Sequence, residues 1–412
     1  MTPSESPIAR LVGARALNTF GRAVISATVL WELYARTDST YVIGKIGLVM
    51  VVPVVLLFVP SGTLVDRSDR RMLTTAAATI TGLIGLGLAC ASYVAAPVWV
   101  YLALLFGLGC VTSVHAPASS SLIPMIIARG ELERTNRISA SLQELAAITG
   151  PALAGLALTW VAPSGVYSVV AVTGIASGAL YRSLPRPRPV PTATAIGGVS
   201  ARKDWRVGLR FIFRSPLLLP ALTLDMFAVL FAGVTALLPA VASDVLHVGP
   251  FGYGVLRAAQ SVGAVGMAVV GGRLAGWKRP GRVLLIVVAL FGLATLGFGL
   301  STSFPLSIAL LVVCGALDNI SVVIRLTLEQ MVVPDAIRGR VSSVHYVFIG
   351  MSNELGAAES GLVAGVIGTV PAIVAGGAVA FAVVGVVAAK WRELAKMPPL
   401  AELRAPDEQL SS

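Results

Sequence analysis

Charged residues are scarce in this chain of 412 residues, in which Asp, Glu, Lys and Arg together make up only 12%. A soluble protein carries about 25% charged residues, so the polar surface that would keep a chain of this size in water is missing. Hydrophobic residues make up 56%, and the mean hydropathy is +0.85. An intrinsically disordered chain would be far less apolar. The composition excludes a cytosolic enzyme and indicates a multi-pass membrane protein.

Cysteine is also rare, and the residues present all fall inside apolar stretches: Cys90, Cys110 and Cys314. This placement suggests neither disulfides nor a metal site. The sequence shows no phosphate-binding loop, metal-ligand cluster or catalytic triad, so we expect no enzyme activity, no metal and no cofactor. The basic residues, which give a net charge of +11, occur in short clusters between apolar stretches rather than on one soluble face. We therefore expect no nucleic-acid partner.

Apolar runs of about 20 residues recur along the chain and predict twelve transmembrane helices. The first six lie near residues 13–35, 43–65, 73–94, 98–123, 138–160 and 164–183. The second six lie near residues 217–241, 253–275, 283–301, 305–327, 342–366 and 371–390. The first run contains Arg15, Asn18 and Arg22, which makes it a poor signal peptide, so we interpret it as a retained first helix.

The longest polar stretch separates the two sets of spans. It begins with a proline-rich segment (185–191) and ends with a basic amphipathic segment (204–214), which we expect to lie on the membrane surface with Trp205, Leu209 and Phe213 inward. The predicted organisation is an N-terminal six-helix bundle (1–183), a cytoplasmic linker (184–214), a C-terminal six-helix bundle (215–391) and a cytoplasmic tail (392–412).

The topology follows from the distribution of Lys and Arg. Most of them fall in the N-terminus, the even-numbered loops and the tail, whereas Arg36, Lys45 and Arg257 fall on the opposite side. The positive-inside rule then predicts that both termini and the central linker are cytoplasmic.

The two predicted bundles match each other at one fixed offset of 210 residues. The matched positions are Gly44 and Gly254, Gly62 and Gly272, Gly82 and Gly292, Pro124 and Pro334, Glu144 and Glu354, and Gly155 and Gly365. Matches in five successive elements without a shift in register indicate two parallel six-helix repeats. In such transporters the substrate site lies between the repeats near the middle of the membrane.

The segment from Gly62 to Arg71 reads G-T-L-V-D-R-S-D-R-R and resembles the loop motif G-x-L-x-D-R-x-x-R-R of the major facilitator superfamily at every defining position. A degenerate copy follows the eighth span (272–282). The resemblance implies a cytoplasmic gate, made here by Gly62, Asp66, Arg67, Arg70 and Arg71. Gly62 would allow close helix approach, and Asp66 would accept hydrogen bonds from a helix N-terminus in the other half. A plain positive-inside anchor remains the alternative.

The fifth span contains Gly150-Pro151-Ala-Leu-Ala154-Gly155, which is similar to the G-P-x-x-G-G motif of exporters in this superfamily, with Ala154 replacing one glycine. Small residues would let the halves approach, and Pro151 would bend the helix; a generic Gly/Pro packing site is the alternative. Residues 332–341 and 348–356 resemble the branch that contains enterobactin exporters and multidrug-efflux proteins.

Charged and amide side chains occur inside several predicted spans, although a charge at a helix centre costs about 2.5–3.5 kcal/mol on insertion scales. The carboxylates that are candidates for proton coupling are Asp225, Glu144, Glu354, Asp318 and Glu359. The candidates for lining the substrate cavity are Asn18, Arg22, His115, Gln143, Gln260, Asn319, Arg325 and Asn353. These residues fall on the spans that line the cavity in the superfamily.

Among the carboxylates, Asp225 is the first choice because its own span contains no basic neighbour. Asp318, Arg325 and Glu329 share one helix face and could form either an ion-pair ladder or a proton relay. His115 is the only titratable residue of the fourth span, where many drug–proton antiporters of the superfamily carry an arginine. It could equally be a packing histidine. Glu32 is interpreted as a solvated residue near the outer interface.

We therefore expect an all-α, twelve-helix transporter of the major facilitator fold in the bacterial inner membrane. The expected function is export of amphipathic small molecules such as drugs, by alternating access and driven by protons. The expected partners are the substrate, protons and membrane lipid, and the expected state is a monomer. The alternatives are a dedicated exporter of one metabolite such as a siderophore, and a non-transporting membrane sensor or scaffold on the same fold.

Overall fold

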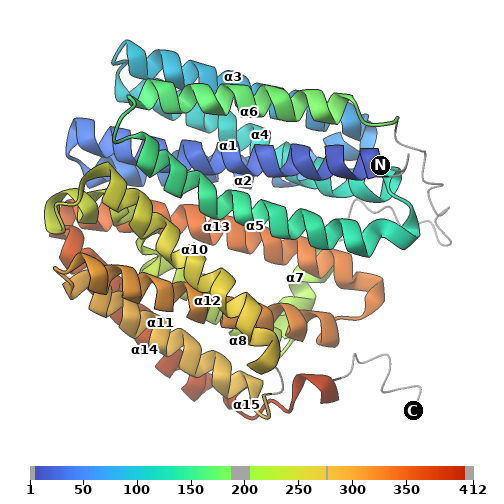
Figure 1. Cartoon of the computed structure of the whole chain (residues 1–412). Coiled ribbons are helices and arrows are strands. Elements are labelled where there is room, and N and C mark those ends of the chain that lie inside the picture. Colours follow the sequence, from blue (N-terminus) through green and yellow to red (C-terminus); the bar gives the residue numbers. More distant parts are fainter. Residues whose placement is uncertain (1–4, 187–204, 275–276, 404–412) are drawn as a thin grey trace. The chain divides into compact units, whose positions relative to one another are not determined.

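A computed structural model describes residues 5–186, 205–274 and 277–403 of the chain. Within these ranges the chain forms helices and no strands (Figure 1). The proline-rich segment of the predicted linker lies largely outside the described residues, as does part of the degenerate motif at 272–282.

The N-terminal half of the described chain consists of long helices joined by short turns. They are α1 (Glu5–Thr37), α2 (Thr40–Arg67), α3 (Arg70–Tyr93), α4 (Val98–Ile126), α5 (Leu132–Ala157) and α6 (Pro163–Arg182), with the short η1 (Arg129–Glu131) before α5. The sequence accounts for where several of them begin. Asp69 caps α3 by accepting hydrogen bonds from the backbone of Arg71 and Met72, and Pro163 occupies the first turn of α6, where its missing N–H costs nothing.

The C-terminal half begins with α7 (Trp205–Arg214), the predicted amphipathic segment, followed by α8 (Leu218–Ala232). The remaining elements are η3 (Val234–Leu237), α9 (Leu238–Ala240), η4 (Val241–Val245), α10 (Gly249–Leu274), α11 (Pro280–Leu300), α12 (Phe304–Val332), α13 (Asp335–Ile367), α14 (Thr369–Lys390), α15 (Arg392–Ala395) and η5 (Leu400–Glu402). On α7, Gly208 and Ile212 are buried, whereas Phe213 is 59% exposed.

Each predicted span coincides with a helical region of the described chain. Nine helical regions among the described residues are long and apolar enough to cross a membrane. The other three are α1, α5 and α13, which are also long but carry more charged and polar side chains. That these three cross the membrane, and that both termini are cytoplasmic, stays a prediction.

The seventh span is not one continuous α-helix. α8 ends at Ala232, and after Gly233 the chain continues through a 3-10 turn, one short α-helical turn and a π-helical turn up to Val245. Pro239 lies in the short α-helical turn. Because proline has no N–H and its ring clashes with the preceding turn, regular helical hydrogen bonding is interrupted here. Broken helices of this kind are tolerated in membranes where the backbone is buried in protein or lines a cavity.

The chain divides into two compact units. Unit 1 comprises Met1–Asp38, Leu48–Ser200 and Val248–Ala258, and unit 2 comprises Ser39–Gly47, Ala201–His247 and Ala259–Ser412. The first turns of α2 therefore pack with unit 2, and the first turns of α10 pack with unit 1. These two exchanged segments are related by the same offset of 210 residues that relates the sequence halves. The predicted boundaries of the two bundles stay a prediction.

Glycine pairs make the close contacts of the two exchanged segments. In unit 1, a Cβ added to Gly254 would lie 2.8 Å from Gly155 Cα, on α5. In unit 2, a Cβ added to Gly44 would lie 2.9 Å from the backbone nitrogen of Leu362, and Gly361 beside it tolerates no Cβ either. Gly44 and Gly254 are repeat mates, so the structure shows the sequence repeat as two equivalent helix contacts.

Inside each unit the packing also follows the repeat. In unit 1, α3 runs along α6, and α1 packs on α5 and α6 (Figure 1). In unit 2, α11 runs along α14, and α8 packs on α13 and α14. The apolar core of unit 2 includes Leu224, Ile324 and Leu328, all fully buried. This core surrounds the charged residues of α8 and α12 that are described next.

Candidate functional site

Unit 2 contains a buried ion pair between α8 and α12. Asp225 Oδ1 contacts the guanidinium of Arg325, and the two side chains are only 11% and 3% exposed. The partner that Asp225 lacks within its own helix is therefore supplied by α12. The sequence pattern could not reveal this pairing, because hydropathy does not determine which sides of neighbouring helices pack together.

One helical turn beyond Arg325, the buried Glu329 interacts with α13. Its carboxylate accepts a hydrogen bond from the hydroxyl of Ser342 and lies 2.5 Å from His345 Nδ1. The predicted ladder of Asp318, Arg325 and Glu329 is therefore not what forms: Arg325 pairs with α8, and Glu329 pairs with α13. His345 was missed by the sequence reasoning, although a lone histidine within the predicted eleventh span was a visible signal.

The remaining candidates in unit 2 are less enclosed. Asp318 and Asn319 are half-buried on α12, and Gln260 on α10 accepts a hydrogen bond from Thr235 at 3.3 Å. On α13, Asn353 is exposed and donates to the carbonyl of Ile349 in its own helix. Glu354 and Glu359 are half-buried on the same helix, and Glu359 accepts a long hydrogen bond from Ser360.

Unit 1 contains a polar cluster between α1 and α4. Arg15 and Asn18 on α1, and Thr112 and His115 on α4, each have a buried side-chain atom with no hydrogen-bond partner: Arg15 Nε, Asn18 Nδ2, Thr112 Oγ1 and His115 Nε2. We call these four residues the α1–α4 donor cluster. Asn18 is only 3% exposed and His115 only 8%.

Neighbouring side chains pack against the donor cluster but form no hydrogen bond with the four atoms named above. The His115 ring packs edge-on against Tyr181 of α6, with centroids 5.7 Å apart. The Tyr181 hydroxyl is itself 3.2 Å from Ser119 Oγ. Arg22, two turns after Arg15 on α1, lies close enough to His115 for its positive charge to act on the imidazole ring. His115 is thus both a packing residue and the carrier of an unsatisfied ring nitrogen.

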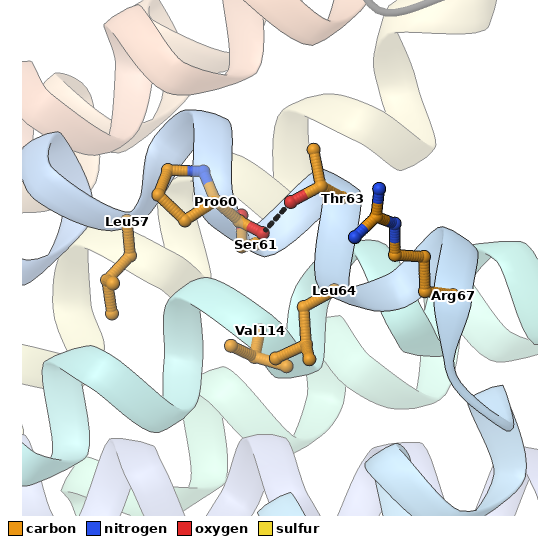
Figure 2. Close-up of a pocket in the computed structure, with 7 residues that line it drawn as sticks. All are labelled: Leu57, Pro60, Ser61, Thr63, Leu64, Arg67 and Val114. Carbon is orange, nitrogen blue, oxygen red and sulfur yellow. Dashed lines mark hydrogen bonds between the residues drawn. The ribbon is translucent and has the colours of Figure 1, made fainter.

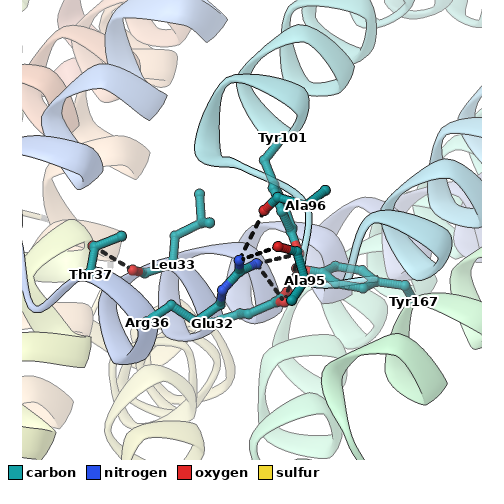
Figure 3. A network of polar contacts seen from close by, with 8 residues as sticks. All are labelled: Glu32, Leu33, Arg36, Thr37, Ala95, Ala96, Tyr101 and Tyr167. Atoms are coloured by element: carbon teal, nitrogen blue, oxygen red, sulfur yellow. Dashed lines mark hydrogen bonds and ion pairs between the residues drawn. The ribbon is translucent and has the colours of Figure 1, made fainter. Parts of the chain in front are cut away.

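A second polar network in unit 1 surrounds Glu32, which is 5% exposed (Figure 3). Its carboxylate accepts hydrogen bonds from the hydroxyls of Tyr101 at 2.8 Å and Tyr167 at 2.9 Å. Arg36 lies 3.7 Å from the same carboxylate and donates to the backbone carbonyls that follow α3. Glu32 is therefore a buried and fully engaged junction of α1, α4 and α6, and the sequence-based interpretation of a solvated residue is wrong.

The other unit 1 candidates lie on α5. Glu144 is exposed, and Gln143 is half-buried and donates back to Ser139 in its own helix, to the carbonyl at 3.0 Å and to the hydroxyl at 3.1 Å. The structure therefore does not bring either of them to the α1–α4 donor cluster.

The loop motif after α2 ties the ends of three helices together. Arg71 donates to the carbonyl of Arg182 at 2.6 Å, at the C-terminus of α6, where a positive charge is favoured by the helix dipole. Arg70 donates to Met125 Sδ at the end of α4. The side chain of Asp66 lies outside the described part of the structure, so its predicted role at a helix N-terminus stays a prediction.

The segment of α2 that carries the motif also borders a cavity of about 360 Å³ (Figure 2). The cavity is lined by Leu57, Pro60, Ser61, Thr63, Leu64, Arg67 and Val114. Gly62 lies in this segment, and no atom would lie within 4 Å of an added Cβ there. The two ends of α2 thus differ: Gly44 is packed tightly, and Gly62 faces open space.

The glycines of the predicted exporter motif do lie at helix contacts. A Cβ added to Gly150 would lie 2.8 Å from Ala23 Cβ on α1, and Gly155 meets Gly254 of α10. Pro151 is buried between them within α5. Within the described residues no three His, Cys, Asp or Glu side chains gather as a metal site.

Comparison with known proteins agrees with this architecture. The family model described as Major Facilitator Superfamily matches residues 11–357. The enterobactin exporter EntS of Citrobacter koseri is 26% identical over 338 residues, which cover 80% of this chain and 79% of the relative. EntS of Shigella boydii is 25% identical over 335 residues, with the same coverage.

Solved structures show the same fold at low identity. A bacterial homologue of the human lysosomal transporter Spinster, in an inward-facing and occupied conformation, superimposes with a TM-score of 0.72 at 16% identity and covers 98% of this chain and 100% of its own. The nucleoside transporter NupG superimposes with a TM-score of 0.66 at 14% identity and covers 95% of this chain and 99% of its own. This chain therefore belongs to the major facilitator superfamily and is a multi-pass membrane transporter rather than an enzyme.

Proposed function

We propose that the protein is a proton-coupled exporter of amphipathic small molecules in the bacterial inner membrane, working by alternating access. The observation that carries the coupling is the buried Asp225–Arg325 pair. Ionisable side chains held inside membrane helices are costly and usually belong to ion or substrate pathways. The direction of transport is supported by the curated relatives, which are named as exporters.

The pair offers a simple way to link proton and substrate. While Asp225 is ionised it neutralises Arg325, and the two charges hold α8 and α12 together. Protonation of Asp225 leaves Arg325 without its counter-charge and weakens that link. Asp318 is half-buried two turns before Arg325 on the same face of α12. A proton entering from the acidic side would thus change which charged side chains of unit 2 are available to the substrate.

Transport in inside-out vesicles tests this proposal. Of a set of cationic, neutral and anionic amphipathic dyes, at least one should accumulate in vesicles that contain the protein when the lumen is acidic, and the accumulation should collapse when the pH gradient is dissipated. A strain lacking the protein that shows unaltered efflux would instead favour a sensor or scaffold.

Substitutions at Asp225 test the coupling step. Asp225→Asn should abolish uphill transport while leaving substrate binding and downhill exchange measurable per folded molecule, and Asp225→Glu should restore part of the uphill activity. Glu133→Gln is the matched control because Glu133 is exposed in the first turn of α5. Full uphill transport by Asp225→Asn would remove this residue from the mechanism.

A second candidate function is dedicated export of one siderophore, and the similarity to relatives named as enterobactin exporters favours it. The two functions differ in breadth of substrate. A dedicated exporter should move enterobactin or a related siderophore and leave unrelated dyes behind, whereas a multidrug exporter should move several unrelated amphipathic compounds in the same vesicles.

A further inference from the structure

The α1–α4 donor cluster concentrates unsatisfied hydrogen-bond donors in one place. Arg15 Nε and Asn18 Nδ2 are N–H donors, and His115 presents another in its Nε2–H tautomer. The two helices contribute residues at the same spacing: Arg15 and Asn18 are three residues apart on α1, and Thr112 and His115 are three residues apart on α4. A spacing of three residues places each pair on one helix face.

Among the described residues of α1, α4 and α6, no free carboxylate is available to these donors. The sequences of α4 and α6 contain no Asp or Glu. α1 contains Glu5 at its first residue and Glu32, whose carboxylate is already bound by Tyr101, Tyr167 and Arg36. A buried donor left without an acceptor costs about 1–3 kcal/mol, and natural proteins keep such groups few. Several donors on two facing helix surfaces therefore indicate an acceptor that comes from outside the chain.

We propose that the α1–α4 donor cluster binds an anionic oxygen group of an amphipathic organic substrate, such as a carboxylate, a sulfonate or an ionised phenol. This inference rests on the proposed function, because it assigns the substrate class of the same transporter. Hydrogen bonds to an ionised acceptor are about twice as strong as neutral ones. A cationic group would meet Arg15 and Arg22 and would find no carboxylate in α4 or α6.

The surroundings explain why the partner is amphipathic rather than a small inorganic anion. Next to the cluster residues in the sequence, Leu17 and Phe20 on α1 and Val111 on α4 are half-buried apolar side chains. A ligand whose charged end reaches Asn18 and His115 can place an aromatic or aliphatic body beside such surfaces. Small hydrated anions gain nothing from them.

Equilibrium binding with two matched fluorophores tests the proposal. Anilinonaphthalene sulfonate carries the anionic group, and N-phenylnaphthylamine has the same aromatic body without it. Saturable binding of each is measured on the full-length protein in lipid nanodiscs, after subtraction of empty nanodiscs. The wild-type protein should bind the sulfonate at least about tenfold more tightly than the neutral probe.

Two substitutions remove single donors. Asn18→Leu removes the amide, and His115→Phe removes Nε2 while keeping a ring that can pack on Tyr181. Each should weaken sulfonate binding by about tenfold and change binding of the neutral probe less than about twofold. Asn136→Leu is the matched control, because Asn136 is exposed at the start of α5, and it should change neither affinity.

Three outcomes would overturn the assignment. The first is equal weakening of both probes by Asn18→Leu and His115→Phe, which would mean a structural role for these side chains. The second is wild-type sulfonate binding in both variants. The third is displacement of the sulfonate probe by chloride or inorganic sulfate at millimolar concentration, which would identify a site for small anions. If Asn18→Leu does not fold, His115→Phe alone decides between these outcomes.

Transport separates this inference from the proposed function. Selective sulfonate binding that depends on Asn18 and His115, with no efflux of any probe from proteoliposomes, would contradict the exporter and leave the anion site intact. Efflux of cationic and neutral dyes with no preference for the sulfonate would contradict the anion site and leave the exporter intact.

Discussion

In unit 2 the buried Arg325 is paired with Asp225, and the buried Glu329 is paired with His345. In unit 1 the buried Asn18 and His115 each keep a polar atom without a partner. The halves of the chain are repeats of one another, and His115 and Arg325 occupy equivalent positions in the sequence, at the same offset of 210 residues. Arg325 Nε also lacks a hydrogen-bond partner, so the difference lies in the counter-charge: the same place in the fold holds a side chain with an acidic partner in one half and, in the other, a histidine whose charged neighbours are Arg22 and Arg15.

This difference suggests a division of labour between the two units. A paired acid and base can exchange a proton and change its pairing without any ligand, which suits the coupling step proposed for unit 2. Donors that have no acceptor gain most when a ligand brings one, which suits substrate recognition in unit 1.

The largest effect is expected at the ion pair of unit 2. Arg325→Met leaves Asp225 buried without its partner and should lower the free energy of unfolding by about 3–5 kcal/mol. The double variant Asp225→Leu with Arg325→Met removes both charges and should recover most of that loss. Thermal unfolding in detergent, followed by the fraction of monodisperse protein, ranks the variants. A double variant as unstable as Arg325→Met would show that the loss of stability does not come from the unpaired charge of Asp225.

Unit 1 contains the contrasting case, a buried carboxylate that accepts hydrogen bonds from two tyrosines. Tyr167→Phe removes a hydrogen bond to the buried Glu32 and should cost about 1.5–3 kcal/mol, since Tyr167 is fully buried. Tyr101→Phe should cost more, because the Tyr101 hydroxyl donates to Glu32 and also accepts a hydrogen bond from Arg36 at 2.9 Å. The same unfolding measurement applies, and equal effects of the two variants would contradict the network as drawn in Figure 3.

Two glycines of unit 1, Gly155 and Gly62, have opposite surroundings. Gly155→Ala places a methyl group against the backbone of Gly254 and should destabilise the protein by about 1–3 kcal/mol. Gly62→Ala meets open space and should leave thermal stability within about 0.5 kcal/mol. If Gly62→Ala nevertheless reduces transport, the residue acts in another conformation of the transport cycle, as its place in the loop motif suggests. A neutral Gly155→Ala would mean that the α5–α10 contact can relax.

Much of the fold could be predicted from the sequence, because apolar runs of fixed length are dictated by the membrane itself. The repeat also was visible, and the contacts of Gly44 and Gly254 show why glycine recurs at that offset. The break after α8 was not predicted, since a single glycine and a proline within an apolar run do not reveal how the helix continues.

The pairing of buried side chains could not be predicted, because it depends on how neighbouring helices are rotated. Asp225 was found as a membrane carboxylate, but its partner Arg325 is on another helix. The sequence favours a solvated Glu32, because Tyr101 and Tyr167 are far from it in the chain. No nearby residue indicates that their hydroxyls bind its carboxylate. Asn18 and His115 were found as candidates, and only the structure shows that their polar atoms lack partners.

The smallest effect is expected at the surface of unit 1, where Asp69 caps α3 within the loop motif. Its Oδ1 accepts hydrogen bonds from the backbone nitrogens of Arg71 at 2.9 Å and Met72 at 3.2 Å. Asp69→Ala should cost about 1 kcal/mol through loss of the cap. Asp69→Asn keeps an equally good capping group without the charge, so it should retain most of the stability. Thermal unfolding of the two variants in parallel therefore separates capping from charge: equal losses in both would assign the effect to the charge of Asp69, and no loss in either would show that the first turn of α3 is held by Arg70 and Arg71 alone.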